Sequence, residues 1–211
     1  HSYRNTRMNT VDNQLPFVSR ASNTSKIYKN YGTVNRDFTE NKLNGIDLRG
    51  TDLSDVVLAR TQLMDVCLAQ SDVSWSFSRD TNWEGFDFSN ANFSLATLRG
   101  ANLRGANLCL AILRGTDLRD ANLQEAILSG SILRNADLRE ANLSNAYLLG
   151  SNLSHAVLSN ANLSNAHLLG ANLDRTDLCG TEVNNARFGW NTGISKSMKF
   201  ELQLRGAIFE D

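Results

Sequence analysis

The chain has 211 residues, a formal net charge of −1 and three cysteines. A nearly neutral chain has no strong field for nucleic acid, and three widely spaced cysteines form neither a disulfide framework nor a zinc site. No apolar run is long enough for a membrane-spanning helix, and no secretory signal opens the chain. We therefore expect a cytoplasmic protein with no membrane span, unless a leader has been removed, and free surface thiols at Cys67, Cys109 and Cys179.

The first part of the chain shows no repeat. Residues 1–23 form a polar arm, and residues 1–35 carry five basic side chains against one acidic one. The excess positive charge is too small to indicate nucleic-acid binding. We expect this arm to be disordered or bound to a partner. Residues 24–37 are predicted to form an N-terminal cap with a short helix at Ser25–Tyr31, which ends before Gly32.

A strict period of five residues organises most of the remaining chain. Every fifth residue from Leu98 to Leu178 is leucine, and a small residue stands two positions before each one. A period of five fits neither an α-helix nor a flat strand, so each pentad is one step of a stacked solenoid with both apolar positions pointing inward. Glycine and asparagine recur at the last position, which predicts a corner with positive φ. The predicted core includes Leu98, Leu103, Leu108, Leu113, Leu118 and Leu123.

The pentads resemble those of the pentapeptide repeat family. The matching runs include ANLRG at 101–105, TDLRD at 116–120 and ADLRE at 136–140. The resemblance implies an all-β solenoid over residues 38–188, a right-handed quadrilateral β-helix with four pentads per coil and short helical caps. With ~4.8 Å between stacked strands, about eight coils make a rod roughly 35–40 Å long.

The repeat is irregular at residues 74–90, although its phase is the same on both sides. Ser78 occupies a leucine position there, and a serine in the core leaves a hole that something must fill. Trp75 or Phe77 could fill it and keep the coil intact, or Ser74–Asn82 could leave the coil as a loop. A third possibility is that both aromatic side chains are exposed anchors for a partner.

One outward position repeats as arginine. Residues twenty apart stack in a four-sided coil, so Arg79, Arg99, Arg119 and Arg139 are predicted to form a column. Aspartate and glutamate flank this column on both sides, at Asp117 and Asp137 and at Asp80, Asp120 and Glu140. The pattern favours a self-neutralising surface ladder, and the alternative is a charged docking face.

Residues 189–211 are predicted to close the other end. Ser195 has the character of an N-cap for a helix at Lys196–Leu204, and Ala207–Phe209 is predicted to be a short strand. We expect Trp190 to plug the last coil, with Met198 and Leu202 also in the cap. The helix is apolar on two sides, so the protein is predicted to be either a monomer or a homodimer joined through this cap, as in some members of the family it resembles.

No catalytic or cofactor pattern emerges. His155 and His167 fall at different phases of the repeat, and no phosphate-binding loop is present. A leucine-filled solenoid has no interior cavity for a small-molecule substrate. We therefore expect a protein that is not an enzyme and has neither cofactor nor metal.

The leading functional hypothesis is a scaffold that binds a protein partner of unknown identity. The candidate interaction surface consists of Arg79, Arg99, Arg119, Arg139, Trp75 and Phe77. The resemblance also allows a DNA mimic that binds gyrase or topoisomerase, but that function requires a strongly acidic rod. Residues 36–188 carry 13 basic and 18 acidic side chains, or 13 − 18 = −5. A regulatory role, suggested by an RGAIFED ending like that of cyanobacterial members, and a purely structural role remain open.

Overall fold

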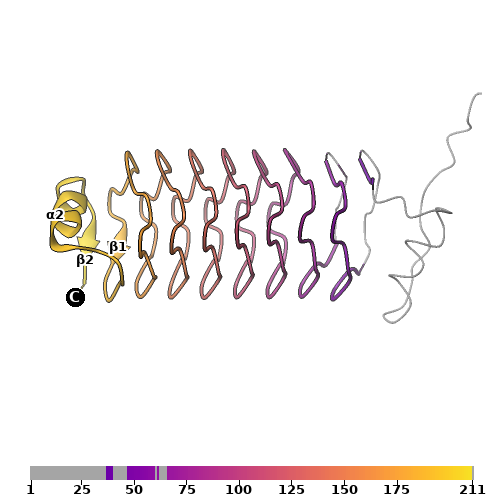
Figure 1. The fold of residues 1–211 in the computed structure, drawn as a ribbon, viewed down its shortest axis with the longest axis horizontal. Coiled ribbons are helices and arrows are strands. Elements are labelled where there is room, and N and C mark those ends of the chain that lie inside the picture. Colours follow the sequence, from indigo (N-terminus) through magenta and orange to yellow (C-terminus); the bar gives the residue numbers. More distant parts are fainter. Residues whose placement is uncertain (1–36, 40–46, 60, 62–65, 211) are drawn as a thin grey trace, which may run out of the picture.

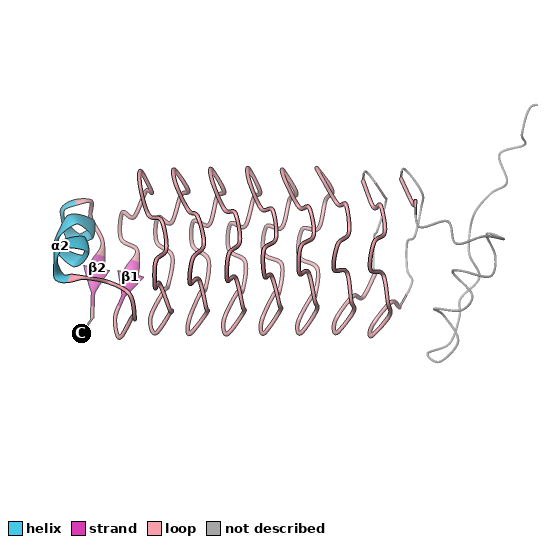
Figure 2. Cartoon of the chain, in the orientation of Figure 1, coloured by secondary structure: helices cyan, strands magenta, loops and turns pink. Residues whose placement is uncertain are grey.

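The protein forms a rod of stacked coils with a small helical unit at one end (Figure 1). The structure is a computed structural model that describes residues 37–39, 47–59, 61 and 66–210. The predicted arm at 1–23 and nearly all of the predicted cap at 24–37 lie outside these residues. Figure 2 shows that the described coils consist of turns and loops, because each side of a coil pairs with its neighbour through a single bridge.

The coils have four sides. Parallel bridges join residues that are twenty positions apart, such as Thr97 with Asp117 and Asp117 with Asp137. The Leu98 N–H, for example, donates to the Asp117 carbonyl at 2.8 Å. Since the sequence repeats every five residues, a coil of twenty residues contains four pentads.

Each corner of a coil is a tight turn. The Ala101 N–H donates to the Leu98 carbonyl at 3.0 Å, and Gly100 between them has a φ of +68°. Asn135 occupies the equivalent position in another pentad with a φ of +59°. The preference for glycine and asparagine at this position therefore reflects a left-handed backbone, which these residues adopt at the lowest cost.

An asparagine or aspartate stands before many of the core leucines and supports both its own turn and the stack. The Asn92 side-chain oxygen accepts a hydrogen bond from the Ser94 N–H at 3.1 Å. Along the rod, the Asn122 amide donates to the Asn102 side-chain oxygen, also at 3.1 Å. An amide or a carboxylate at this position thus satisfies backbone donors that the narrow turn leaves without partners.

The interior of the rod is filled by the two apolar positions of each pentad. The six predicted core leucines are fully buried, as is Ala101. Buried threonine and serine at the small position, except Ser76, donate to backbone carbonyls, as the Thr116 hydroxyl does to Phe93 at 2.8 Å. These contacts leave the outward positions free to vary without disturbing the core.

The irregular segment at 74–90 remains a regular coil. Bridges from Phe77 to Thr97 and from Asn82 to Asn102 continue through it, so the loop alternative is wrong. The filling residue is also not Trp75 or Phe77, because Trp83 is fully buried and lies edge-on to Phe88 at 5.1 Å. Trp83 stands at an inward position, whereas Trp75 and Phe77 stand at a corner and an outward position.

This aromatic filling leaves a cluster of polar atoms in the core. Ser76, Ser78 and Trp83 are buried, and their hydroxyl oxygens and indole nitrogen have no hydrogen-bond partner among the described residues. Unpaired buried polar groups cost about 1–3 kcal/mol each. The coil therefore keeps the geometry of the repeat but packs its interior less favourably than its neighbours do.

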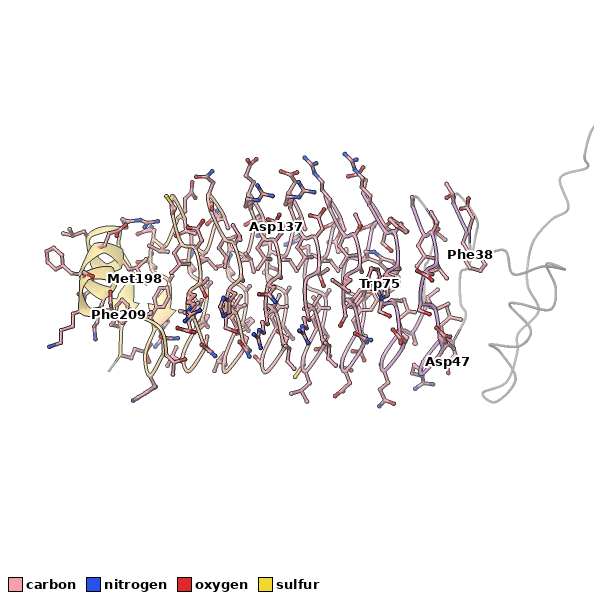
Figure 3. All side chains as sticks on the ribbon, in the orientation of Figure 1. Phe38, Asp47, Trp75, Asp137, Met198 and Phe209 are labelled. Carbon is pink, nitrogen blue, oxygen red and sulfur yellow. The ribbon has the colours of Figure 1, made fainter. Side chains whose placement is uncertain are left out.

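The C-terminal cap consists of α2 (Lys196–Leu204) and a two-stranded parallel pair, β1 (Arg187–Phe188) and β2 (Ile208–Phe209). The helix has the predicted bounds, and the Ser195 hydroxyl accepts from the Met198 N–H at 3.2 Å. Leu202 is buried, Met198 packs against the core, and the Phe209 ring stacks on Phe188 at 5.1 Å. Figure 3 shows Met198 and Phe209 together at this end of the rod.

The prediction that Trp190 plugs the last coil is wrong. Its side chain is 68% exposed, and its φ is +50°. Trp190 stands in the same corner column as Gly150 and Gly170, and side chains at corners point away from the interior. The repeat also extends one side further than predicted, because Asn172 forms a bridge with Thr192.

Candidate protein-interaction surface

Three large apolar side chains lie exposed around one corner of the rod. Trp75 is 57% exposed and Phe77 53%, and Leu95 stands in the next coil at the same corner as Trp75. Val57 precedes Phe77 in its bridged column. We call Trp75, Phe77 and Leu95 the aromatic corner. A rigid aromatic pair beside an aliphatic side chain is the typical composition of an interface anchor.

The backbone at this corner is strained. Trp75 has a φ of +58° and Leu95 a φ of +61°, at positions where the repeat most often has glycine or asparagine. A bulky residue with left-handed φ costs free energy, and the surrounding turn forces it into that conformation. Leu95 is not among the residues predicted from the sequence, although a large apolar residue at the corner position is the signal that identifies it.

The predicted arginine column is present, and its members are ion-paired. Arg119 donates to both carboxylate oxygens of Asp117, at 2.8 and 2.7 Å, and Arg139 does the same with Asp137, at 2.8 and 2.6 Å. Arg99 donates to Asp120 at 2.9 Å, and Arg79 lies 3.4 Å from Asp80. The arrangement is the self-neutralising ladder, and the label on Asp137 locates it in Figure 3.

The ladder shifts the acidities of its carboxyl groups. The pKa of Asp117 is lowered, first by the side-chain hydrogen bond from Arg119, and burial opposes this shift. The pKa of Asp137 is lowered in the same way by Arg139. Asp137 also lies 3.6 Å from Arg119, so it joins two rungs of the ladder.

Acidification is expected to weaken this ladder. Both carboxyl groups have a pKa below the unfolded value in the folded chain, so their stabilisation is complete above about pH 4 and disappears as the pH falls through the folded pKa. The pairs are partly exposed, so each contributes about 1 kcal/mol at most. Thermal unfolding of wild type and Asp137→Asn between pH 6 and about pH 2 checks this, because the difference between them should vanish at low pH. A difference that stays constant with pH contradicts the ladder.

The metal-ligating side chains of the described residues are scattered along the rod. No group of three or more His, Cys, Asp or Glu side chains could hold a metal ion within that part of the chain. His155 stands at a corner, and His167 stacks on Tyr147 with ring centroids 5.1 Å apart. Cys67 and Cys179 are exposed free thiols, and Cys109 is half-buried. Among the described residues no helix is long and apolar enough to cross a membrane.

Comparison with known structures supports the fold. HetL, a pentapeptide repeat protein involved in heterocyst differentiation regulation in the cyanobacterium Nostoc sp. strain PCC 7120, is 28% identical; the match covers 78% of this chain and 83% of HetL with a TM-score of 0.50. A trypsin-treated form of QnrB1, a plasmid-mediated fluoroquinolone resistance protein, is 17% identical over 84% of this chain and 87% of that one, with a TM-score of 0.44. No curated protein matches.

The family model for pentapeptide repeats matches in eight copies. They fall within residues 37–70, 79–108, 91–130, 105–139, 116–154 and 156–189, which together cover most of the chain. These matches, with the twenty-residue coils and the likeness to HetL, show a right-handed quadrilateral β-helix. The chain belongs to the pentapeptide repeat family.

Proposed function

We propose that this protein is a non-catalytic scaffold whose aromatic corner binds another protein. The observation that carries the proposal is the exposure of Trp75 and Phe77 by more than half on a coil that is otherwise regular. Trp83 fills the interior of that coil, so these two aromatic side chains are not needed to complete the core. Large aromatic side chains exposed on a rigid backbone supply contact area at little entropic cost.

The arginine ladder provides a polar border for this anchor. Phe77 and Arg79 lie on the same side of one coil, and the column continues through Arg99. Arg79 is the most exposed of the four arginines, and its closest carboxylate is further away than those of the other three. A partner with an apolar pocket and a carboxylate beside it fits this combination, because rim charges select orientation more than they add affinity.

The likeness to HetL supports a regulatory use of the scaffold. HetL is a family member involved in differentiation regulation, and the match covers most of both chains. A DNA mimic that binds gyrase is less well supported, because the acids of the ladder pair with arginines in place of forming an anionic surface. A supercoiling assay with excess protein tests that alternative, and we expect no inhibition of gyrase.

Substitution at the aromatic corner tests the proposal. We expect Trp75→Asn combined with Phe77→Thr to abolish retention of a partner in quantitative affinity enrichment from the cells that encode this chain. Each lost hot-spot side chain weakens binding by about 2 kcal/mol or more. Asparagine and threonine already occur in these columns, at Asn135 and Thr97, so the variant remains compatible with the coil.

The matched control is Val157→Thr, in the same outward column as Phe77. It should retain the partner as wild type does. Equal retention by the corner variant, with its fold shown intact by thermal unfolding, contradicts the proposed site. The absence of any specific partner for wild type favours a purely structural role.

A further inference from the structure

A second surface contains no charged residue over four consecutive coils. It lies around one corner, where the segments 107–112, 127–132, 147–152 and 167–172 stack on one another. None of these segments contains Asp, Glu, Lys or Arg. The exposed side chains that define this apolar edge are Leu110, Ile112, Ile127, Ile132, Tyr147 and Leu149.

The apolar edge is comparable in size to the largest apolar patch of a typical monomer, and such patches are often functional. Its six side chains are each about two-fifths to more than half exposed, and together they present on the order of 500 Å² of apolar area. A stable interface buries roughly 800 Å² on each partner. Neutral side chains of the same segments, Asn107, Asn152 and Ser129, can supply part of the remainder.

At this corner a protruding leucine side chain lies next to glycine backbone that no side chain covers. Leu110 adopts a φ of +58°, a costly conformation for leucine, and its side chain lies over Gly130. A Cβ at Gly130 would lie 2.8 Å from Leu110 Cδ2. At Gly150, one coil further along the same corner, a Cβ would meet nothing within 4 Å. The backbone at Gly150 is therefore uncovered, next to the glycine that Leu110 covers.

We propose that a second copy of this chain covers the apolar edge in an antiparallel two-fold dimer. A two-fold axis through the coil at 127–132 sets segment 107–112 of one copy opposite segment 147–152 of the other. Leu110 then faces the bare Gly150 of the other copy, and the contact repeats reciprocally, as an isologous interface requires. The stacked segments themselves carry no charge, so the centre of the contact buries none, and the exposed Arg114 and Arg134 lie at its rim.

The dimer is distinct from one formed through the cap. Phe200 and Leu204 on α2 are also exposed, at 64% and 73%, and would join the rods end to end. The apolar edge joins them side by side and leaves the aromatic corner accessible on a different corner of each rod. The two arrangements are therefore separable by substitution.

Sedimentation velocity over a wide range of protein concentration tests the proposal. We expect a dimer for wild type and at least about a hundredfold weaker association for Ile132→Asp, because each change occurs twice in a two-fold interface. Aspartate occurs naturally in this column at Asp52 and Asp72, so the change suits the repeat. Val157→Asp, the same kind of change in a column that contains Asp137 and Asp177, should leave the dimer intact.

A cross-link tests the direction of the rods. In the antiparallel arrangement Cys109 lies opposite position 149 of the other copy. We expect Leu149→Cys, with Cys67 and Cys179 replaced by serine, to form a reducible intermolecular disulfide with Cys109 when diamide oxidises the two thiols. A monomer at all concentrations, or a dimer that Phe200→Asp disrupts and Ile132→Asp does not, overturns the proposal; a dimer without this cross-link overturns its antiparallel geometry.

Discussion

Trp83→Leu is expected to lower the free energy of unfolding by about 2–4 kcal/mol, because it opens a cavity beside Ser78 that the coil cannot close. The indole is fully buried and lies edge-on to Phe86 and Phe88, at 5.3 and 5.1 Å. Ser78→Leu is expected to be destabilising too, by about 1–3 kcal/mol, because the leucine competes with the indole for the same space.

The double variant Ser78→Leu with Trp83→Leu should recover most of this loss. It restores the leucine of a regular pentad at both positions and removes two of the three unpaired polar atoms in the coil. Equilibrium unfolding in urea gives the interaction free energy between the two substitutions, which we expect to be at least about 2 kcal/mol. Trp83→Leu combined with Leu143→Ala, three coils away, should be additive. A double variant as unstable as the sum of the single changes shows that Trp83 does not compensate for Ser78.

Gly193→Ala is expected to detach the C-terminal cap from the rod. Gly193 has a φ of +83°, and a Cβ there would lie 2.3 Å from the Asp174 nitrogen and 2.4 Å from its Cα. These are backbone atoms of the last coil, so they cannot move away as a side chain could. The loss should be about 3 kcal/mol or more, and it should fall on α2 and β2.

Limited proteolysis and hydrogen exchange measure this effect locally. We expect residues 194–210 of the Gly193→Ala variant to be cleaved and exchanged rapidly, while the central coils stay protected. Gly105→Ala is the matched control, because Gly105 has a φ of +63° and nothing within 4 Å of the new Cβ. It should cost only about 1 kcal/mol. Equal protection of the cap in both variants contradicts the proposed close approach.

The fold follows from the sequence because the core positions barely vary. Leucine, a small residue and an amide in a fixed order identify the inward side chains, and a twenty-residue stack places every outward column. The helix at Lys196–Leu204 was predictable for a similar reason, since Ser195 caps it and an apolar side packs on the last coil.

The errors arise where a residue departs from the repeat. Trp75 and Trp190 are large and apolar, which favours an interior position, but both stand at corners, which point outward whatever the residue type. The position of a residue within the five-residue repeat therefore decides its burial more strongly than its hydrophobicity does. The same rule identifies Leu95 and Leu110 as exposed, because both stand at corner positions of the repeat.

The candidate sites are recognised by comparing residues that stack on one another in the coils. These residues are twenty positions apart, so their proximity is not evident along the linear sequence. The arginine column was predictable because identical residues recur at an interval of twenty. The apolar edge consists of six side chains in four columns around one corner, and it becomes visible only when the coils are stacked.

The central claim, that the aromatic corner binds a protein, is tested most directly by photo-crosslinking in the cells that encode this chain. A photoreactive phenylalanine analogue replaces Phe77 in one protein and Val157, in the same column, in another. We predict a discrete adduct with one protein at position 77 and none at position 157. No adduct at position 77, or the same adducts at both positions, would contradict the claim.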